Sequence, residues 1–282
     1  MNNIYKSFLN RKQSDSSFYS VSSEQYAYIK SHHKYHRSVS ISRWIILICF
    51  LILWEISTCN SWIDGFFFSS PSRIVICLFQ LLYKKELFSH CFTTLTETII
   101  SFLLVTILSI LVATILWYSK KLAEIVEPFL VILNSLPKSA LAPLFIVWLG
   151  TGPLTIIIAG ISVALFGSII SIYTGFKEID EEKIKLIYTL RGHKKDVLTK
   201  VILPGSIPIL FSTMKVNIGL ALVGVIIGEF LSARKGLGYL IIYGSQVFQL
   251  DLVISSILIL CLFAMLLYLC IQFSEHFYKK NF

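Results

Sequence analysis

Charged residues are scarce in this chain of 282 residues, where Asp, Glu, Lys and Arg together make up only 15%. Soluble domains carry about 25% charged residues and about 45–50% apolar ones, whereas 55% of this chain is hydrophobic. A water-soluble fold of this length could not bury so much apolar surface. The composition therefore excludes an ordinary soluble protein.

Several chemical signatures are also missing. No G-x-x-x-x-G-K-[ST] loop occurs, so the chain has no evident means of binding ATP itself. The six cysteines show no C-x-x-C spacing, and we interpret them as small apolar side chains in helices. No histidine lies inside an apolar run and the acids are scattered, which argues against a membrane-embedded enzyme. We expect no catalytic residue, no metal site, no cofactor and no nucleic-acid partner.

Six apolar stretches are long enough to cross the hydrocarbon layer, which is about 30 Å thick and needs about 20 helical residues. They predict an all-α, polytopic membrane protein in contact with the lipid bilayer. The third stretch is interrupted by Pro137 and Pro143. The six expected spans are 45–62, 93–118, 125–149, 154–173, 209–231 and 252–273.

The basic residues are distributed unevenly between the connections. Eighteen of the 25 Lys and Arg residues fall in 1–43, 120–121, 177–200 and 279–280, which are alternate connections along the chain. The positive-inside bias places these segments, and hence both termini, in the cytoplasm of a cell with the protein in its plasma membrane. The polar, Ser-rich start predicts a flexible cytoplasmic tail rather than a cleavable signal peptide.

These patterns divide the chain into four parts. We expect a polar tail at 1–43, a first span with an outer loop at 44–87, a core of spans at 88–277 that contains a charged loop at 177–208, and a short cytoplasmic tail at 278–282.

The charged loop between the fourth and fifth spans predicts a short amphipathic helix. Ile184, Ile187 and Leu190 recur at helical spacing and share one face. Asp180 is a suitable N-cap and Gly192 a suitable stop at the C-terminal end. Such a helix can lie on lipid headgroups, pack on its own bundle, or enter a groove on another protein. Composition leaves these three uses open.

The run from Thr189 to Gly205 resembles the conserved cytoplasmic loop, or EAA loop, of permease subunits of ABC-type importers. That loop ends in an apolar residue, any residue and Leu-Pro, matched here by Val201-Ile202-Leu203-Pro204. Counted back from Leu-Pro, the family's loop glycine falls on Arg191, and the Glu-Ala-Ala positions fall on residues 185–187. Other stretches are similar to the nitrate/sulfonate/taurine branch, in the same order along residues 44–277: SSPSRI (69–74), Glu127-Pro128, SLPKSALAPLFIVWLGTG (135–152) and GEFLSARKGLGYLI (228–241).

The resemblance implies the fold of a type I ABC importer permease, a transport subunit and not an enzyme. It implies two cytoplasmic ATPase subunits that bind ATP, a second permease subunit in a homodimer, and an extracellular binding protein. The cargo would be a small solute, an anion such as a sulfonate, taurine or nitrate. The ATPase-coupling residues would be Asp180, Ile184, Ile187, Leu190, Arg191, Gly192, Leu203 and Pro204, with the three apolar side chains of the stripe buried in the ATPase groove.

Lys138 is the leading candidate for the translocation pathway. It would lie about 15 Å along the third span, where a charge is costly and by default functional. Asn134 and the backbone freed by Pro137 would give it polar company. The alternative is that Pro137 bends this stretch toward the cytoplasm, where the ammonium only reaches the interface.

Glu229 would lie about 30 Å along the fifth span, near the outer mouth. It could gate the path or contact the binding protein, or it could form a structural ion pair with Arg234. Gly224 and Gly228 give a GxxxG spacing for close helix packing, within one subunit or between two.

The main competing hypothesis is a secondary transporter driven by an ion gradient. Such folds commonly contain internal repeats, and the sequence shows no convincing duplication.

Overall fold

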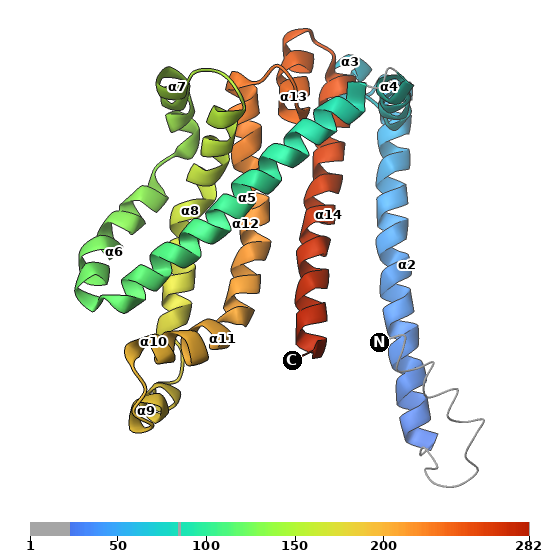
Figure 1. The fold of residues 1–282 in the computed structure, drawn as a ribbon. Helices are drawn as coiled ribbons and strands as arrows, with labels where there is room; N and C mark the ends of the chain where they lie inside the picture. Colours follow the sequence, from blue (N-terminus) through green and yellow to red (C-terminus); the bar gives the residue numbers. More distant parts are fainter. Residues whose placement is uncertain (1–22, 84–85, 282) are drawn as a thin grey trace. The chain divides into compact units, whose positions relative to one another are not determined.

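The computed structural model describes residues 23–83 and 86–281, and every regular element in these ranges is a helix (Figure 1). The chain divides into two compact units, residues 1–62 and residues 63–282. The all-α prediction is confirmed for the described residues.

The first unit contains one long helix, α2 (Ser23–Cys59). Its apolar part, Ser38–Cys59, has 22 residues and a mean hydropathy of 2.0, enough to cross a membrane. The helix starts well before the expected span, so that residues 23–43, which we assigned to the polar tail, are helical. No Pro or Gly occurs between Ser23 and Cys59, so nothing in the sequence interrupts the helix. The remainder of the predicted tail, residues 1–22, lies outside the described residues.

The second unit contains four further helices long and apolar enough to span a membrane. They are α5 (Glu86–Tyr118), α8 (Pro153–Lys177), α12 (Ile207–Ser232) and α14 (Leu250–Asn281). Each covers one expected span, and α14 extends through most of the predicted C-terminal tail. With α2 they make five candidate spans within the described residues.

The third expected span is not one continuous helix. It consists of α6 (Lys120–Ser135) and α7 (Lys138–Leu149), which meet at 95°. If this bent pair is taken as one span, the described residues contain six candidate spans. The break falls at Pro137, as predicted, because proline holds the preceding Leu136 in an extended conformation. The expected interruption at Pro143 is wrong, since this residue lies inside α7.

Short helices lie at the two ends of the second unit (Figure 1). One end carries α3 (Gly65–Phe68), α4 (Pro71–Tyr83) and α13 (Leu237–Gln246), and we call it the α13 end. The opposite end carries α9 (Glu181–Thr189), α10 (Lys194–Val197), the π-helix η1 (Leu198–Ile202) and α11 (Leu203–Gly205), and we call it the α9 end. Helix α5 runs obliquely past α8 and α12 from the first end to the second.

Small residues allow α8 and α12 to pack closely. A Cβ atom at Gly224 would lie 2.7 Å from the Cα of Gly160 and 2.8 Å from the carbonyl oxygen of Ala159. A Cβ at Gly228 would lie 2.9 Å from the Cα of Ile156. The GxxxG spacing therefore serves a contact within one subunit, which was one of its two predicted uses.

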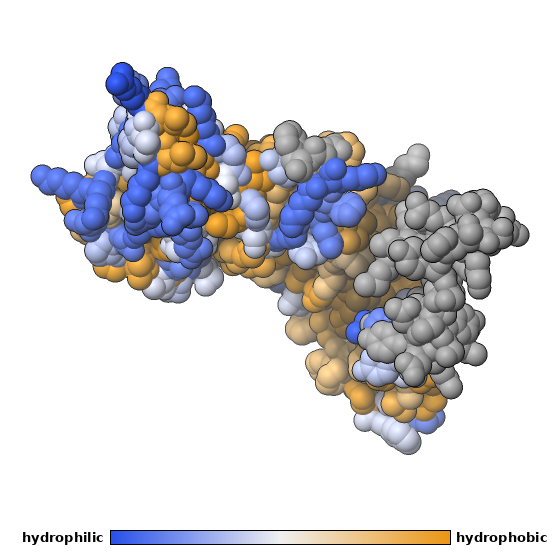
Figure 2. Space-filling model, turned by 90° about the horizontal axis from the view of Figure 1, so that it is seen from below, coloured by the Kyte–Doolittle hydropathy of each residue, from blue (hydrophilic) through white to orange (hydrophobic). Residues whose placement is uncertain are grey.

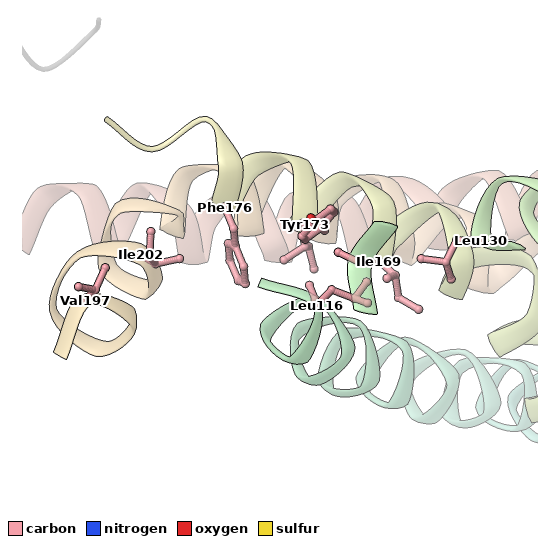
Figure 3. Packing of buried hydrophobic residues seen from close by; sticks show 10 residues of the cluster. Leu116, Leu130, Ile169, Tyr173, Phe176, Val197 and Ile202 are labelled. Atoms are coloured by element: carbon pink, nitrogen blue, oxygen red, sulfur yellow. The ribbon is translucent and has the colours of Figure 1, made fainter. Parts of the chain in front are cut away.

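A buried apolar cluster joins the α9 end to the spans (Figure 3). Val197 of α10 and Ile202 of η1 are fully buried beside Phe176 of α8. Leu116 of α5 and Leu130 of α6 continue the same cluster along the bundle. The short helices are thus packed onto the spans rather than loosely attached to them.

Candidate functional site

The connector between α8 and α12, residues 178–206, contains all eight predicted coupling residues. Its first helix, α9, begins where predicted, because the Asp180 carboxylate accepts a 2.9 Å hydrogen bond from the amide of Glu182. That contact satisfies one of the free N–H groups of the first turn. Glu181 and Lys185 form an exposed ion pair one turn apart at 3.3 Å.

The C-terminal end of α9 is closed by two backbone hydrogen bonds. The amide of Arg191 donates to the carbonyl of Tyr188, and the amide of Gly192 donates to that of Ile187, both at 2.9 Å. This is the Schellman pattern, which needs a left-handed residue just after the helix. That residue is Arg191, with φ of +59°.

Gly192 helps to close the C-terminal end of α9 through its amide, but it is not the left-handed residue. Its φ is not positive, and it is the space at this position that favours glycine. A Cβ there would lie 2.5 Å from Cγ2 of Ile187 and 2.9 Å from its carbonyl oxygen. The resemblance placed the family's loop glycine on Arg191, and this is the position that takes the left-handed conformation.

Two of the three residues of the apolar stripe, Ile184 and Ile187, face the protein's own core, which corrects the expected docking surface. Ile184 and Ile187 are partly buried against the cluster that contains Val197 and Ile202. Leu190, by contrast, is 71% exposed, and Leu186 on the same side is 58% exposed. Helical periodicity identified the stripe but not what covers it, because an internal and an external partner require the same spacing.

Lys194 fastens the connector to the end of α5, a contact that the sequence analysis missed. Its Nζ donates a 2.8 Å hydrogen bond to the carbonyl oxygen of Tyr118, the last residue of α5. The same ammonium lies 5.6 Å from the ring centroid of Trp117 and 5.0 Å from that of Tyr118. A cation at a helix C-terminus and over aromatic rings is favourable on both counts.

The rest of the connector is held by local caps. The backbone amide of His193 donates to the Asp196 carboxylate at 2.8 Å, and Lys200 lies 3.5 Å from it. These contacts hold the pKa of Asp196 below its usual value. Leu203 is partly buried against the core cluster, whereas Pro204 is exposed in α11.

Lys138 lies at the break between α6 and α7. Its Nζ donates 2.6 Å hydrogen bonds to the carbonyl oxygens of Leu133 and Asn134, in the last turn of α6. It also lies 5.9 Å from the ring centroid of Phe166 on α8. We expected Lys138 to lie in the middle of a helix. It is instead the first residue of α7 and a cap for the end of α6.

Glu229 is buried, with 1% of its surface exposed, at the α13 end of α12. Its Oε1 accepts a 2.6 Å hydrogen bond from the Thr94 hydroxyl, and its Oε2 accepts one of 2.6 Å from the amide of Gly238. The predicted ion pair with Arg234 is wrong, since Arg234 is exposed and takes part in none of the ion pairs of the described segments. A contact between Glu229 and an external protein is also excluded in this conformation by its burial.

The described residues contain no group of three or more His, Cys, Asp or Glu side chains arranged to hold a metal ion.

Comparisons with known proteins agree with this architecture. The sequence model of the family described as "Binding-protein-dependent transport system inner membrane component" matches residues 93–280. A probable ABC transporter permease protein of Haemophilus influenzae is 27% identical over 232 residues, which cover 82% of this chain and 94% of the relative. The formylaminopyrimidine transport permease protein ThiX of Halalkalibacterium halodurans is 26% identical, with 69% and 77% covered. The putative aliphatic sulfonates transport permease protein SsuC of Bacillus subtilis is 25% identical, with 74% and 76% covered.

A solved structure is also similar in fold. A chain of the MetNI methionine ABC transporter in an inward-facing conformation superposes with a TM-score of 0.56 at 18% identity, covering 64% of this chain and 90% of that one. The fold is that of type I ABC importer permeases, as the resemblance implied. The chain therefore belongs to the family of binding-protein-dependent transport system inner membrane components and is the permease subunit of an ABC-type importer, a transport protein and not an enzyme.

Proposed function

We propose that this permease forms the path of a small solute across the membrane and that its α8–α12 connector receives the movement of a partner ATPase. The observation that carries the proposal is the outer side of α9. There Leu186 and the C-cap residue Leu190 are exposed apolar side chains beside a helix otherwise rich in charge. An apolar centre with a charged rim is the arrangement expected of a surface that docks into a protein groove.

The packing of the connector supports a mechanical role. Ile184 and Ile187 hold α9 onto the core cluster, and Lys194 holds α10 onto α5. A displacement of α9 is therefore passed to several spans at once. A flexible loop would absorb the same displacement.

We propose that the α9 end and both termini face the cytoplasm. The support is the distribution of the basic residues along the sequence, where 18 of the 25 Lys and Arg residues fall in the alternate segments 1–43, 120–121, 177–200 and 279–280. Figure 2 views the second unit from the α9 end, and hydrophilic side chains cover much of the surface seen there, with smaller apolar areas between them. The α13 end would then face the extracellular binding protein.

We propose that the path runs beside the break between α6 and α7. Broken helices at membrane depth are tolerated where they are buried in protein or line a water-filled cavity. Asn134 and Pro137 are exposed at this break, and Lys138 caps it. In this proposal Lys138→Met lowers uptake while assembly with the ATPase persists, and unchanged uptake removes the residue from the path.

For the cargo, we propose a small organic anion such as a sulfonate. The support is the similarity to permeases named for aliphatic sulfonates and for taurine. Relatives named for formylaminopyrimidine and riboflavin define the competing cargo class. Competition between these solutes in an uptake assay with the cognate binding protein discriminates the two classes.

We propose a complex of two permease subunits, two ATPase subunits and one binding protein, with the permease as a homodimer. Native mass spectrometry of the purified complex measures this stoichiometry directly.

The docking proposal is tested with Leu190→Asp in the complete transporter. Burial of a leucine side chain is worth about 1.5–3 kcal/mol, and a buried unpaired carboxylate adds a further penalty. We expect loss of ATPase binding by at least about tenfold, since about 1.4 kcal/mol corresponds to tenfold. Leu190→Met is the matched control, because it keeps an apolar side chain of similar volume. Equal ATPase binding and uptake by both variants would exclude the proposed docking surface.

A further inference from the structure

The first residues of α13 are held by side chains from two other helices. The amide of Gly236 donates to Nδ1 of His90 at 3.0 Å, that of Leu237 to the Thr94 hydroxyl at 2.8 Å, and that of Gly238 to Oε2 of Glu229 at 2.6 Å. The N-cap residue of α13 is Gly236, which has no side chain to cap its own helix. Helices α5 and α12 therefore supply the cap that α13 lacks.

A second buried carboxyl group lies beside this cap. Glu97, one turn after Thr94 on α5, is only 4% exposed, and its side chain is within hydrogen-bonding reach of the Glu229 carboxylate. One of its oxygens, Oε2, is buried without a hydrogen-bond partner among the described residues. Neither acid takes part in an ion pair in residues 23–83 and 86–281.

Two ionised carboxylates are not stable in this arrangement. Two like charges in contact in a medium of reduced dielectric constant repel each other strongly, and removing each charge from water adds a further cost. Within the described residues, no cation forms an ion pair with either acid to offset these costs. Adjacent buried carboxyl groups elsewhere resolve the same conflict by sharing one proton between them.

The hydrogen bonds identify which of the two acids is ionised. Both oxygens of Glu229 accept, one from a hydroxyl group and one from a backbone amide, and it lies at the positive end of the α13 dipole. No hydroxyl or amide of the described residues donates to Oε2 of Glu97, and the partner of its carboxyl group is the acceptor Glu229. The geometry therefore favours the charge on Glu229 and the proton on Glu97.

We propose that Glu97 and Glu229 form a proton-binding site, in which the Glu97 hydroxyl donates to the ionised Glu229 and thereby keeps α13 docked on α5 and α12. The ligand is a single proton. When it leaves at high pH, two negative charges face each other and the cap of α13 is weakened.

The other titratable groups near the site are few. His90 on α5 stacks on Tyr239 of α13, with ring centroids 6.0 Å apart, and Glu86 and Lys235 lie near His90. Helix α8 contributes no titratable residue in its first 20 residues, from Pro153 to Ile172.

Infrared spectroscopy of the full-length protein in membranes tests the site directly. At neutral pH we expect the C=O stretching band of a buried, protonated carboxyl group, which disappears in Glu97→Gln. Glu127→Gln, at an exposed position on α6, is the matched control and leaves the band unchanged. The proposal is overturned if no Glu97-dependent band is seen at neutral pH. It is also overturned, in favour of a bound metal cation, if the band appears only after Na⁺ and K⁺ are removed.

Hydrogen exchange of the amides of residues 236–240 provides a second readout. We expect protection, relative to the unfolded chain, to fall in the native protein at the pH where the infrared band is lost. Glu97→Gln keeps a neutral hydrogen-bond donor beside Glu229, so protection there persists across the same pH range. The same pH dependence in both proteins contradicts the proposed role of the proton.

Discussion

Arg191 is the residue at which a single substitution should make α9 more stable. It adopts φ of +59° directly after the helix, a conformation that costs a non-glycine residue about 1–2 kcal/mol. The hydrogen bonds that close the helix use only backbone atoms, so Arg191→Gly keeps them. Arg191 is also exposed and takes part in none of the ion pairs of the described residues, so little else is lost.

The magnitude follows from two opposing terms. Glycine removes the strain but loses about 0.5–1 kcal/mol through its greater freedom in the unfolded chain. The net gain is about 0.5–1 kcal/mol, which corresponds to opening of the α9 end about two- to fivefold less often. Hydrogen exchange followed by mass spectrometry on residues 181–192 measures this opening.

Gly192→Ala is the matched comparison, one residue further along the chain. Its new Cβ would meet the carbonyl oxygen of Ile187 at 2.9 Å, so we expect faster exchange in the same peptide. Faster or unchanged exchange in Arg191→Gly would refute the assignment of Arg191 as the left-handed residue. Slower exchange in Gly192→Ala would refute the tight contact at Gly192.

Three further predictions concern other contacts. Lys194→Met removes the hydrogen bond to Tyr118 and the ring contacts, so we expect less uptake per ATP hydrolysed with ATPase binding retained, whereas Lys195→Met, at the exposed neighbouring lysine, leaves this ratio unchanged. Gly224→Ala forces α8 and α12 apart and lowers the melting temperature in detergent, whereas Gly219→Ala, where no described atom lies within 4 Å of the new Cβ, does not. Because the pKa of Asp196 is depressed, this residue stabilises the connector above about pH 3.8, the ordinary pKa of an aspartate, and the stabilisation is lost as the pH falls through the pKa in the folded protein. Hydrogen exchange of the α10 amides in acid measures this loss. We expect Asp196→Asn to abolish the pH dependence.

Composition and periodicity predicted much of the fold because membrane spans are local features. The length of an apolar run determines whether it can span, and Asp180 needs only its neighbours to cap α9. The right-angle turn between α6 and α7 was not predicted, because Pro137 and Pro143 are chemically alike and only their surroundings decide which one breaks the helix.

The candidate site was predicted less well, because its contacts join distant parts of the chain. Ile184 and Ile187 have the spacing of a buried stripe, but the sequence does not say whether the cover is internal or a partner. Glu229 bonds to Thr94, which is 135 residues away, and Lys194 bonds to Tyr118, which is 76 residues away. A single sequence carries no signal for such pairs.

The central claim is that energy from ATP enters this permease through the exposed side of α9. Photo-crosslinking from position 190, in membranes that contain the complete transporter, tests it most directly. The account predicts a crosslink to the ATPase subunit from position 190 and none from position 243 on α13. Crosslinks to the ATPase from position 243, with none from position 190, would contradict it.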